Sequence, residues 1–241
     1  MQLFYAPDIS GKEYIFPQDE SKHIAKVLRL KEGDKINITD GKGNLYISEI
    51  EASDSKQCKV KVISKEAEVG KRSFSVHIAI APTKNIKRFE WFLEKCTEIG
   101  IDEITPLNCR FSEREHIRDD RLNRVISSAM KQSVKMYHPV LNEMTGFEDF
   151  LSSEAANTEN RFIAICDEEP KDHLKNAYEI GKDVVVIIGP EGDFSDKEKE
   201  KAIEKGFQPV TISASRLRTE TAGVVACQIV NLLNEQDQKR V

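Results

Sequence analysis

The sequence predicts two domains: a small β-barrel of roughly seventy residues and, after it, an α/β domain with a mainly parallel sheet. Up to residue 66 the segments are short and alternate between apolar and polar residues, whereas after residue 73 strand patterns alternate with helix patterns. Residues 184–188 are all Val or Ile, as expected of a parallel strand that is covered on both faces. The predicted bounds are 1–68 and 73–241.

A hairpin is the clearest pattern in the first domain. Residues 35–39 alternate in hydrophobicity, a turn with two glycines follows, and residues 44–50 have the pattern of the partner strand. Residues 59–62 predict a third strand, and residues 19–28 predict a short helix ahead of the hairpin. Short strands with one short helix are typical of a small barrel.

In the second domain, a strand over residues 75–80 leads into a helix over residues 86–99. Phe89, Phe92 and Cys96 lie on one face of that helix at helical spacing. The other predicted elements are strands over 102–107, 161–166, 183–189 and 207–212, a long polar helix over 118–136, and a final helix over 219–235.

Composition excludes several classes of protein. Hydrophobic residues make up 39% of the 241 residues and charged residues 32%, which excludes a chain that is disordered over most of its length. No apolar run is long enough to cross a bilayer, and the N-terminus lacks the pattern of a signal peptide. The five cysteines are scattered and never form CxxC, so we expect no metal site and a cytoplasmic location.

A loop rich in glycine follows the apolar strand. It reads Gly189-Pro190-Glu191-Gly192, and the S-x-x-E pattern from Ser195 to Glu198 begins a helix soon after it. In open α/β sheets, ligands bind beyond the carboxyl ends of strands, and glycine lets a ligand approach the backbone. The GxGxxG and Walker patterns are absent. The segment is therefore a ligand-binding loop of another kind or an ordinary turn between strand and helix.

Two arginines, Arg216 and Arg218, precede the apolar final helix. The N-terminus of a helix favours anions, so arginines at this position indicate an anion or another partner. Two interpretations stay open. The arginines form surface ion pairs with Glu220 or Glu191, or one of them faces a phosphate or a charge that develops during a reaction.

Five segments, taken in order, form a recognisable set. They are HIAKVLRLKEGD at 23–34, KCTEIGI at 95–101, KQS at 131–133 followed by Pro139, GPEGDFS at 189–195, and SRLRTETAG at 215–223. Together they resemble the RsmE family, bacterial enzymes of the SPOUT class that methylate a uridine of 16S ribosomal RNA at ring nitrogen N3. Asp193 departs from the family pattern, which usually has a glycine at that position.

The resemblance implies a SPOUT-type α/β methyltransferase domain with a trefoil knot, joined to an N-terminal PUA-like β-barrel that binds RNA. It also implies that S-adenosylmethionine is the cofactor and that no metal is needed. The cofactor is expected between the loop at 189–192 and the loop at 212–217. The residues expected to bind it are Ile188, Gly189, Pro190, Glu191, Gly192, Ile212, Ser213, Leu217, Arg218 and Ala222.

The reaction implied by the resemblance is a direct displacement, in which uracil N3 attacks the methyl group of the cofactor. N3 carries a proton, so catalysis needs a cation that stabilises the uracil anion or a base that takes the proton. Arg218 is the expected cation. Glu220 or Glu191 is expected to position the base or to orient the arginine, and Glu220 joins Arg218 as the predicted catalytic pair.

RNA has to bind to local groups of basic residues, because the net charge of the whole chain is -5. Between residues 110 and 138, seven Lys or Arg residues face four Asp or Glu residues. The residues expected to contact RNA, through phosphates rather than base edges, are Lys22, His23, Lys26, Arg29, Arg110 and Arg114. The alternative for each lysine is a solvated helix face, and for His23 it is packing within the barrel domain.

The final helix is more apolar than one buried face requires. It is either fully buried in the monomer or part of a homodimer interface in the C-terminal domain, as the family uses. The expected partners are 16S rRNA or the small ribosomal subunit and a second copy of the chain, with no membrane. Two alternatives for the function are a methyltransferase of the same class that acts on another RNA and a non-catalytic RNA-binding ribosome-assembly factor.

Overall fold

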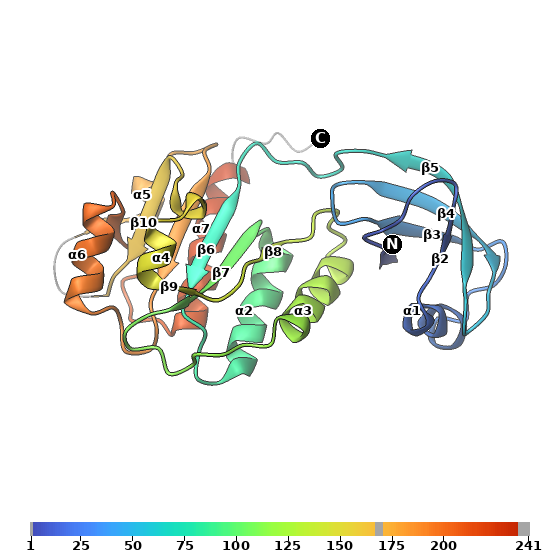
Figure 1. Cartoon of the computed structure of the whole chain (residues 1–241). Coiled ribbons are helices and arrows are strands. Elements are labelled where there is room, and N and C mark those ends of the chain that lie inside the picture. Colours follow the sequence, from blue (N-terminus) through green and yellow to red (C-terminus); the bar gives the residue numbers. More distant parts are fainter. Residues whose placement is uncertain (1, 167–170, 236–241) are drawn as a thin grey trace. The chain divides into compact units, whose positions relative to one another are not determined.

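The computed structural model describes residues 2–166 and 171–235, and the chain divides into two compact units (Figure 1). The first unit comprises residues 1–71 and 130–138, and the second comprises residues 72–129 and 139–241. The sequence assigned residues 130–138 to the second domain. The structure groups them with the first, because the His138 N–H donates to Gly41 O at 2.9 Å and the Gly43 N–H donates to Met136 O at 2.9 Å.

A five-stranded sheet forms the first unit, in the order β1-β3-β4-β5-β2. Only β1 and β3 pair in parallel, and the other neighbours are antiparallel. Its core contains Phe4, Phe16, Ile24 and Ile38, all of them buried. The strands are β1 (Leu3–Tyr5), β2 (Glu13–Ile15), β3 (Lys35–Thr39), β4 (Leu45–Ala52) and β5 (Lys59–Glu66).

The predicted helix over residues 19–28 is split in the structure. The α-helix α1 (Gln18–Lys22) continues into one π-helical segment, η1 (His23–Val27), in which the Leu28 N–H donates to His23 O at 3.0 Å. The segment ends at Val27, and Arg29, two residues later, has a φ of 56° in the left-handed region.

An eight-stranded sheet forms the second unit, in the order β11-β13-β10-β12-β6-β7-β8, with β9 paired to β7. The sequence predicts a mainly parallel sheet, and all pairs among its described strands are parallel. The strands are β6 (Val76–Ile80), β7 (Glu103–Asn108), β8 (Val140–Leu141), β9 (Thr145–Gly146), β10 (Asn160–Ala164), β11 (Asp172–His173), β12 (Val184–Ile188) and β13 (Gln208–Thr211).

Helices cover both faces of this sheet (Figure 1). Side chains of β12 alternate between the two cores, with Val184 and Val186 on one side and Val185 and Ile187 on the other. The first core is shared with α2 (Ile86–Ile99), α3 (Asp119–Gln132), α5 (Leu174–Ala177) and α7 (Thr219–Glu235). The second is shared with α4 (Phe147–Leu151), the 3₁₀ turn η2 (Glu154–Ala156) and α6 (Asp196–Glu204).

Helix α3 ends at Gln132, four residues before the predicted end at Met136. Val134 has a φ of 55°, in the left-handed region, and no α-helix continues through that conformation. Such a φ is strained for a β-branched residue. The change of backbone conformation at Val134 therefore accounts for the end of α3 at Gln132.

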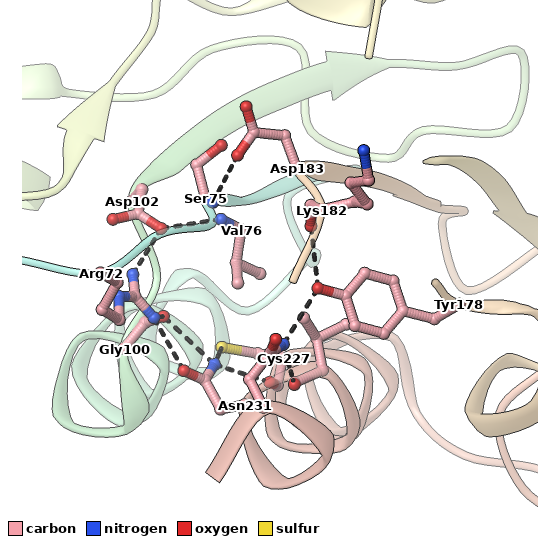
Figure 2. Close-up of polar contacts among 12 residues, drawn as sticks. Arg72, Ser75, Val76, Gly100, Asp102, Tyr178, Lys182, Asp183, Cys227 and Asn231 are labelled. Atoms are coloured by element: carbon pink, nitrogen blue, oxygen red, sulfur yellow. Dashed lines mark hydrogen bonds and ion pairs between the residues drawn. The ribbon is translucent and has the colours of Figure 1, made fainter. Parts of the chain in front are cut away.

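A network of polar contacts lies at the amino ends of the strands in the second unit (Figure 2). Arg72 Nη1 donates to Gly100 O at 2.7 Å and to Asn231 Oδ1 at 2.8 Å, and Arg72 Nη2 pairs with Asp102. The Val76 N–H donates to the same Asp102 carboxylate at 2.7 Å. These contacts tie the first residues of β6 to the last turns of α7.

Further contacts extend this network toward β12. The Ser75 N–H donates to Asp183 Oδ1 at 2.7 Å (Figure 2). The Tyr178 hydroxyl donates to Lys182 O at 2.8 Å and accepts from Asn234 Nδ2 at 2.9 Å. Buried polar groups at this end of the sheet thus have partners, which stabilises the fold.

Candidate active site

A cavity of about 380 Å³ opens at the opposite end, beyond the carboxyl ends of β10, β12 and β13. The parallel register sets Ala164 of β10 beside Ile188 of β12 and Val210 of β13. The three loops that leave these strands therefore meet at one edge of the sheet, which is where ligands bind in open α/β sheets. The start of α7 and Arg88 of α2 complete the wall.

The residues that the sequence assigned to the cofactor meet in this cavity, with one exception. Gly192 does not line it, and a Cβ added at Gly192 would lie 3.1 Å from Phe111 Cβ. Those that line it are Ile188, Gly189, Pro190, Glu191, Ile212, Ser213, Leu217, Arg218 and Ala222.

The sequence interpretation missed one wall of the cavity. Ala164, Ile165 and Cys166, at the end of β10 and just after it, line the cavity together with Arg88, Asp193 and Arg216. The rule that ligands gather at the carboxyl ends of strands pointed to β10 as well. This segment has neither glycine nor an unusual charge, so nothing else in its composition marked it.

The chemistry of the walls fits S-adenosylmethionine. Ile188, Ile212 and Leu217 provide apolar surface of the kind that holds an adenine ring. The rim carries charges of both signs, with Arg216 among the cations and Glu191 among the carboxylates, as the amino and carboxylate groups of the cofactor require. The volume of about 380 Å³ lies in the usual range for small-molecule sites.

Asp193 gives the loop after β12 its shape. Its φ is 64°, and its N–H donates to Pro190 O at 3.0 Å, which closes a tight turn. Glycine adopts this backbone conformation without strain, which accounts for the glycine of the family pattern. Asp193 takes it as one of the residue types that tolerate it best, and its carboxylate lies 3.3 Å from Lys199 Nζ.

The predicted capping box at the start of α6 is confirmed. The Ser195 N–H donates to Glu198 Oε2 at 2.8 Å, and Ser195 Oγ accepts from the Glu198 N–H. Glu198 is buried, and its other oxygen accepts from the Arg110 N–H at 2.8 Å. The loop after β12 is therefore fixed to the loop that follows β7.

A second set of hydrogen bonds fixes the loop after β6. Glu191 Oε1 accepts from the Lys84 N–H at 3.0 Å. Arg114 donates to Thr83 O at 3.1 Å and to Lys84 O at 2.6 Å, so its guanidinium holds backbone of its own domain. Arg110 is exposed. The sequence predicted both arginines as RNA contacts, and the structure places Arg114 as a support of the site.

Glu220, in the first turn of α7, is 5% exposed. Its Oε1 lies 3.8 Å from Arg88 Nε, and its Oε2 is buried without a hydrogen-bond partner among the described residues. A buried carboxylate oxygen without a donor is unfavourable, so this atom is suited to accept a hydrogen bond from a ligand. Arg218 is exposed at the cavity rim.

The other predicted RNA contacts lie in the first unit. Lys22, Lys26 and Arg29 are exposed, and His23 is half-buried in the helical segment formed by α1 and η1. These side chains lie on one short stretch of backbone.

Residues 2–166 and 171–235 contain neither a metal-binding cluster nor a helix that could span a membrane. No group of three or more His, Cys, Asp or Glu side chains is placed to hold a metal ion. No helix in those ranges is long and apolar enough to span a membrane.

Comparison with known proteins decides the family. Residues 70–231 match the RNA methyltransferase domain family, and residues 16–63 match the RNA methyltransferase PUA domain family. The ribosomal RNA small subunit methyltransferase E 2 of Borreliella burgdorferi is 31% identical over 210 residues, which cover 83% of each chain. This chain belongs to the RsmE family.

Solved structures agree with that assignment. A probable rRNA-methyltransferase from Porphyromonas gingivalis is 42% identical over 99% of this chain and 100% of its own, with a TM-score of 0.92. A Legionella pneumophila protein solved with bound S-adenosylmethionine is 25% identical over 95% and 96%, with a TM-score of 0.85. The predicted fold class, a SPOUT-type α/β domain after a PUA-like domain, is confirmed, and the RsmE-family chain is an RNA methyltransferase that uses S-adenosylmethionine.

Proposed function

We propose that this chain methylates N3 of a uridine in 16S ribosomal RNA, with Arg218 and Glu220 as its catalytic residues. The observation that carries the proposal is one cavity in which three strand-end loops meet, with exposed Arg218 on its rim and buried Glu220 close by. The names of the ribosomal RNA small subunit methyltransferases that the chain resembles support the choice of RNA.

The apolar walls formed by Ile188, Ile212 and Leu217 hold the adenine end of the cofactor. When bound, the cofactor supplies an electrophilic methyl group on a sulfonium. Gly189 and Pro190 are buried at the end of β12 and let the backbone approach the ligand. Glu191 and Arg216 provide the opposite charges that orient its amino acid group.

Arg218 lowers the barrier by stabilising the charge that develops on the uracil. Loss of the N3 proton spreads negative charge over the two carbonyl oxygens of the ring, and a guanidinium offers donors in a fixed plane to such oxygens. A donor of this kind contributes on the order of a hundredfold in rate.

Glu220 is better placed than Glu191 to take the N3 proton. One oxygen of Glu191 is held by the Lys84 N–H, and the residue is exposed. Glu220 is buried and has an oxygen that no described residue reaches. As the N3–H bond breaks toward Glu220, the freed electron pair of N3 forms the new bond to the methyl carbon, and the bond from that carbon to sulfur breaks with its electron pair left on the sulfur, which becomes a neutral thioether.

In this proposal the RNA phosphates bind to the exposed cations Lys22, Lys26 and Arg29 of the first unit, where His23 belongs to the same helical segment, and to exposed Arg110 of the second unit. Contacts of this kind position the RNA without reading its sequence. A homodimer through the C-terminal domain is part of the proposal, supported by Leu232 of α7, which is 49% exposed.

Two experiments test the proposed function. Mass spectrometry of 16S rRNA from a deletion strain is expected to show loss of one N3-methyluridine, which returns when the gene is restored. Retention of that nucleoside in the deletion strain would overturn the substrate. Calorimetry with S-adenosylmethionine is the second test, because a ribosome-assembly factor that had lost catalysis would not bind the cofactor at high micromolar concentration.

A further inference from the structure

Helix α2 exposes a tryptophan that its packing does not require. Phe89, Phe92 and Leu93 of α2 are fully buried in the core of the second unit. Trp91 points away from that core and is 42% exposed. A large aromatic side chain on a polar surface gains little from packing, so its position indicates contact with a ligand or partner.

A second cavity, of about 550 Å³, lies between α2 and the start of α7. It shares Arg88, Arg216, Leu217 and Arg218 with the cofactor cavity, so the two spaces meet at the same side chains. Its full lining is Lys87, Arg88, Trp91, Arg216, Leu217, Arg218, Glu220 and Thr221.

The charges around this cavity favour an anionic ligand. Four of its lining residues are Lys or Arg and one is Glu. Lys87 and Arg88 lie four and three residues before Trp91, which places all three on one side of α2. Cations beside an exposed aromatic ring are the combination that binds single-stranded nucleic acid, where the ring stacks on a base and the cations hold phosphates.

Glu220 lines this cavity with a buried carboxylate oxygen that no described residue donates to. Its buried Oε2 has no hydrogen-bond partner among the described residues, although Arg88 stands near the other oxygen. A nucleobase that stacked on Trp91 and carried an N–H group would supply that donor.

We propose that the cavity between α2 and α7 is the binding site of the uracil that is methylated, with Trp91 stacked on the ring and Glu220 Oε2 accepting from N3–H. This rests on the proposed function and assigns Trp91 as a specificity and positioning residue of that reaction. A second copy of the chain is the less favoured occupant, since a two-fold interface would bring these cations against the same cations of the partner copy.

The chain contains one tryptophan, so its fluorescence reports on this cavity alone. The full-length protein is titrated with a 16S rRNA fragment that contains the methylation site, in the presence of S-adenosylhomocysteine to prevent turnover. Saturable quenching of Trp91 is expected, in parallel with binding followed by the anisotropy of labelled RNA. A matched fragment in which the target nucleotide is abasic is expected to bind through its phosphates without quenching.

Substitutions provide the second readout. W91A is expected to lower kcat/KM for the fragment about tenfold or more, as lost base stacking does, with unchanged binding of S-adenosylmethionine in calorimetry. W91F keeps an aromatic ring and is expected to retain most of the activity. I203A is the matched control, because Ile203 is an apolar residue that is 50% exposed on α6 and outside both cavities.

The base site would be overturned by full quenching with the abasic fragment or by bound RNA that leaves Trp91 unquenched. A change in the mass of W91A by light scattering would overturn it too, because it would assign Trp91 to a contact between copies. Normal N3 methylation by W91A would also overturn it while the proposed reaction stands. Quenching that requires the target uridine would support the base site even if the methyl group were found on another ring atom, which would correct the proposed reaction.

Discussion

At the two ends of the parallel sheet in the second unit, the polar side chains differ in whether they have hydrogen-bond partners. At the amino ends of the strands, Arg72, Asp102 and Asn231 bond to one another and to backbone (Figure 2). At the carboxyl ends, Arg218 is exposed at a cavity rim and Glu220 has a buried oxygen without a hydrogen-bond partner in the part of the chain that the structure describes. Paired groups stabilise the folded chain, whereas the unpaired ones are available to a ligand.

Helix α7, seventeen residues long, carries polar side chains of both kinds. Glu220 stands in its first turn, and Asn231 stands three turns later with its side-chain nitrogen donating to Cys227 O at 2.9 Å. A Cβ added at Gly223 between them would lie 2.6 Å from Phe92 Cε2, so α7 packs closely against α2. This packing fixes the start of α7 where the two cavities meet.

The largest effect is expected for R218A. We expect turnover to fall by about a hundredfold or more, because the developing charge on uracil loses its cation. Binding of S-adenosylmethionine and the midpoint of urea unfolding are expected to stay near those of the wild type. Methyl transfer from labelled cofactor and calorimetry measure the two properties. Turnover close to the wild-type value would remove Arg218 from the chemistry.

E220Q is expected to lower turnover by roughly a hundredfold, since the amide cannot take the N3 proton. The free energy of unfolding is expected to stay the same or rise, because the substitution removes a buried charge from an incompletely bonded site. Urea unfolding and single-turnover methylation separate the effects. A clear loss of stability would show that Glu220 is a structural group like those at the other end of the sheet.

R72M is the complementary substitution at the paired end. It leaves Asp102 and the Asn231 side chain short of a partner, and we expect the free energy of unfolding to fall by about 2 kcal/mol. The turnover of the remaining folded protein is expected to be unchanged. Asp102 is 34% exposed, which moderates the loss. Reduced turnover without reduced stability would contradict the division between the two ends.

The smallest effect concerns His77, a buried residue in β6. Its Nδ1 lies 3.2 Å from Ala155 O, which can only accept, so in the neutral ring Nδ1 carries the proton and Nε2 accepts from the Thr105 hydroxyl at 2.8 Å. Burial lowers the pKa of His77 below its ordinary value, only partly opposed by Glu103 and the Ala155 carbonyl. The neutral ring therefore stabilises the fold at neutral pH.

Because the pKa of His77 is lowered in the folded state, its contribution to stability changes with pH in a definite direction. Below the unfolded pKa, about 6.5 for histidine, the unfolded chain binds the proton more readily, and the stability from His77 is lost as the pH falls through the folded pKa. We expect the wild type to lose more stability than H77Q between pH 7.5 and pH 5 in urea unfolding. Equal losses in the two proteins would show that His77 does not contribute to the acid sensitivity.

Much of this domain was predictable because its signals are local. The apolar run of β12, the capping box at Ser195 and the arginines before α7 each depend on neighbouring residues in the chain, and all three lie where the sequence placed them. Parallel strands then bring their carboxyl ends together, which collected most of the predicted cofactor residues.

Features that depend on backbone partners far along the chain were not predictable. His138 joins the first unit through a hydrogen bond from its N–H to Gly41 O, a contact without a side-chain pattern. Arg114 was indistinguishable in sequence from an exposed cation, yet it donates to two carbonyls of the loop after β6. The left-handed backbone conformation of Val134, which shortens α3, also has no pattern in the sequence that predicts it.

The cysteines have a practical consequence for studying this protein. Four of them are buried, and burial raises the pKa of Cys58, Cys96 and Cys109, which keeps those thiols unreactive. Cys166 is exposed and lines the cavity beyond the carboxyl ends of β10, β12 and β13. A maleimide dye would therefore label the native wild-type protein at one place, on the wall of that cavity, without any engineered thiol.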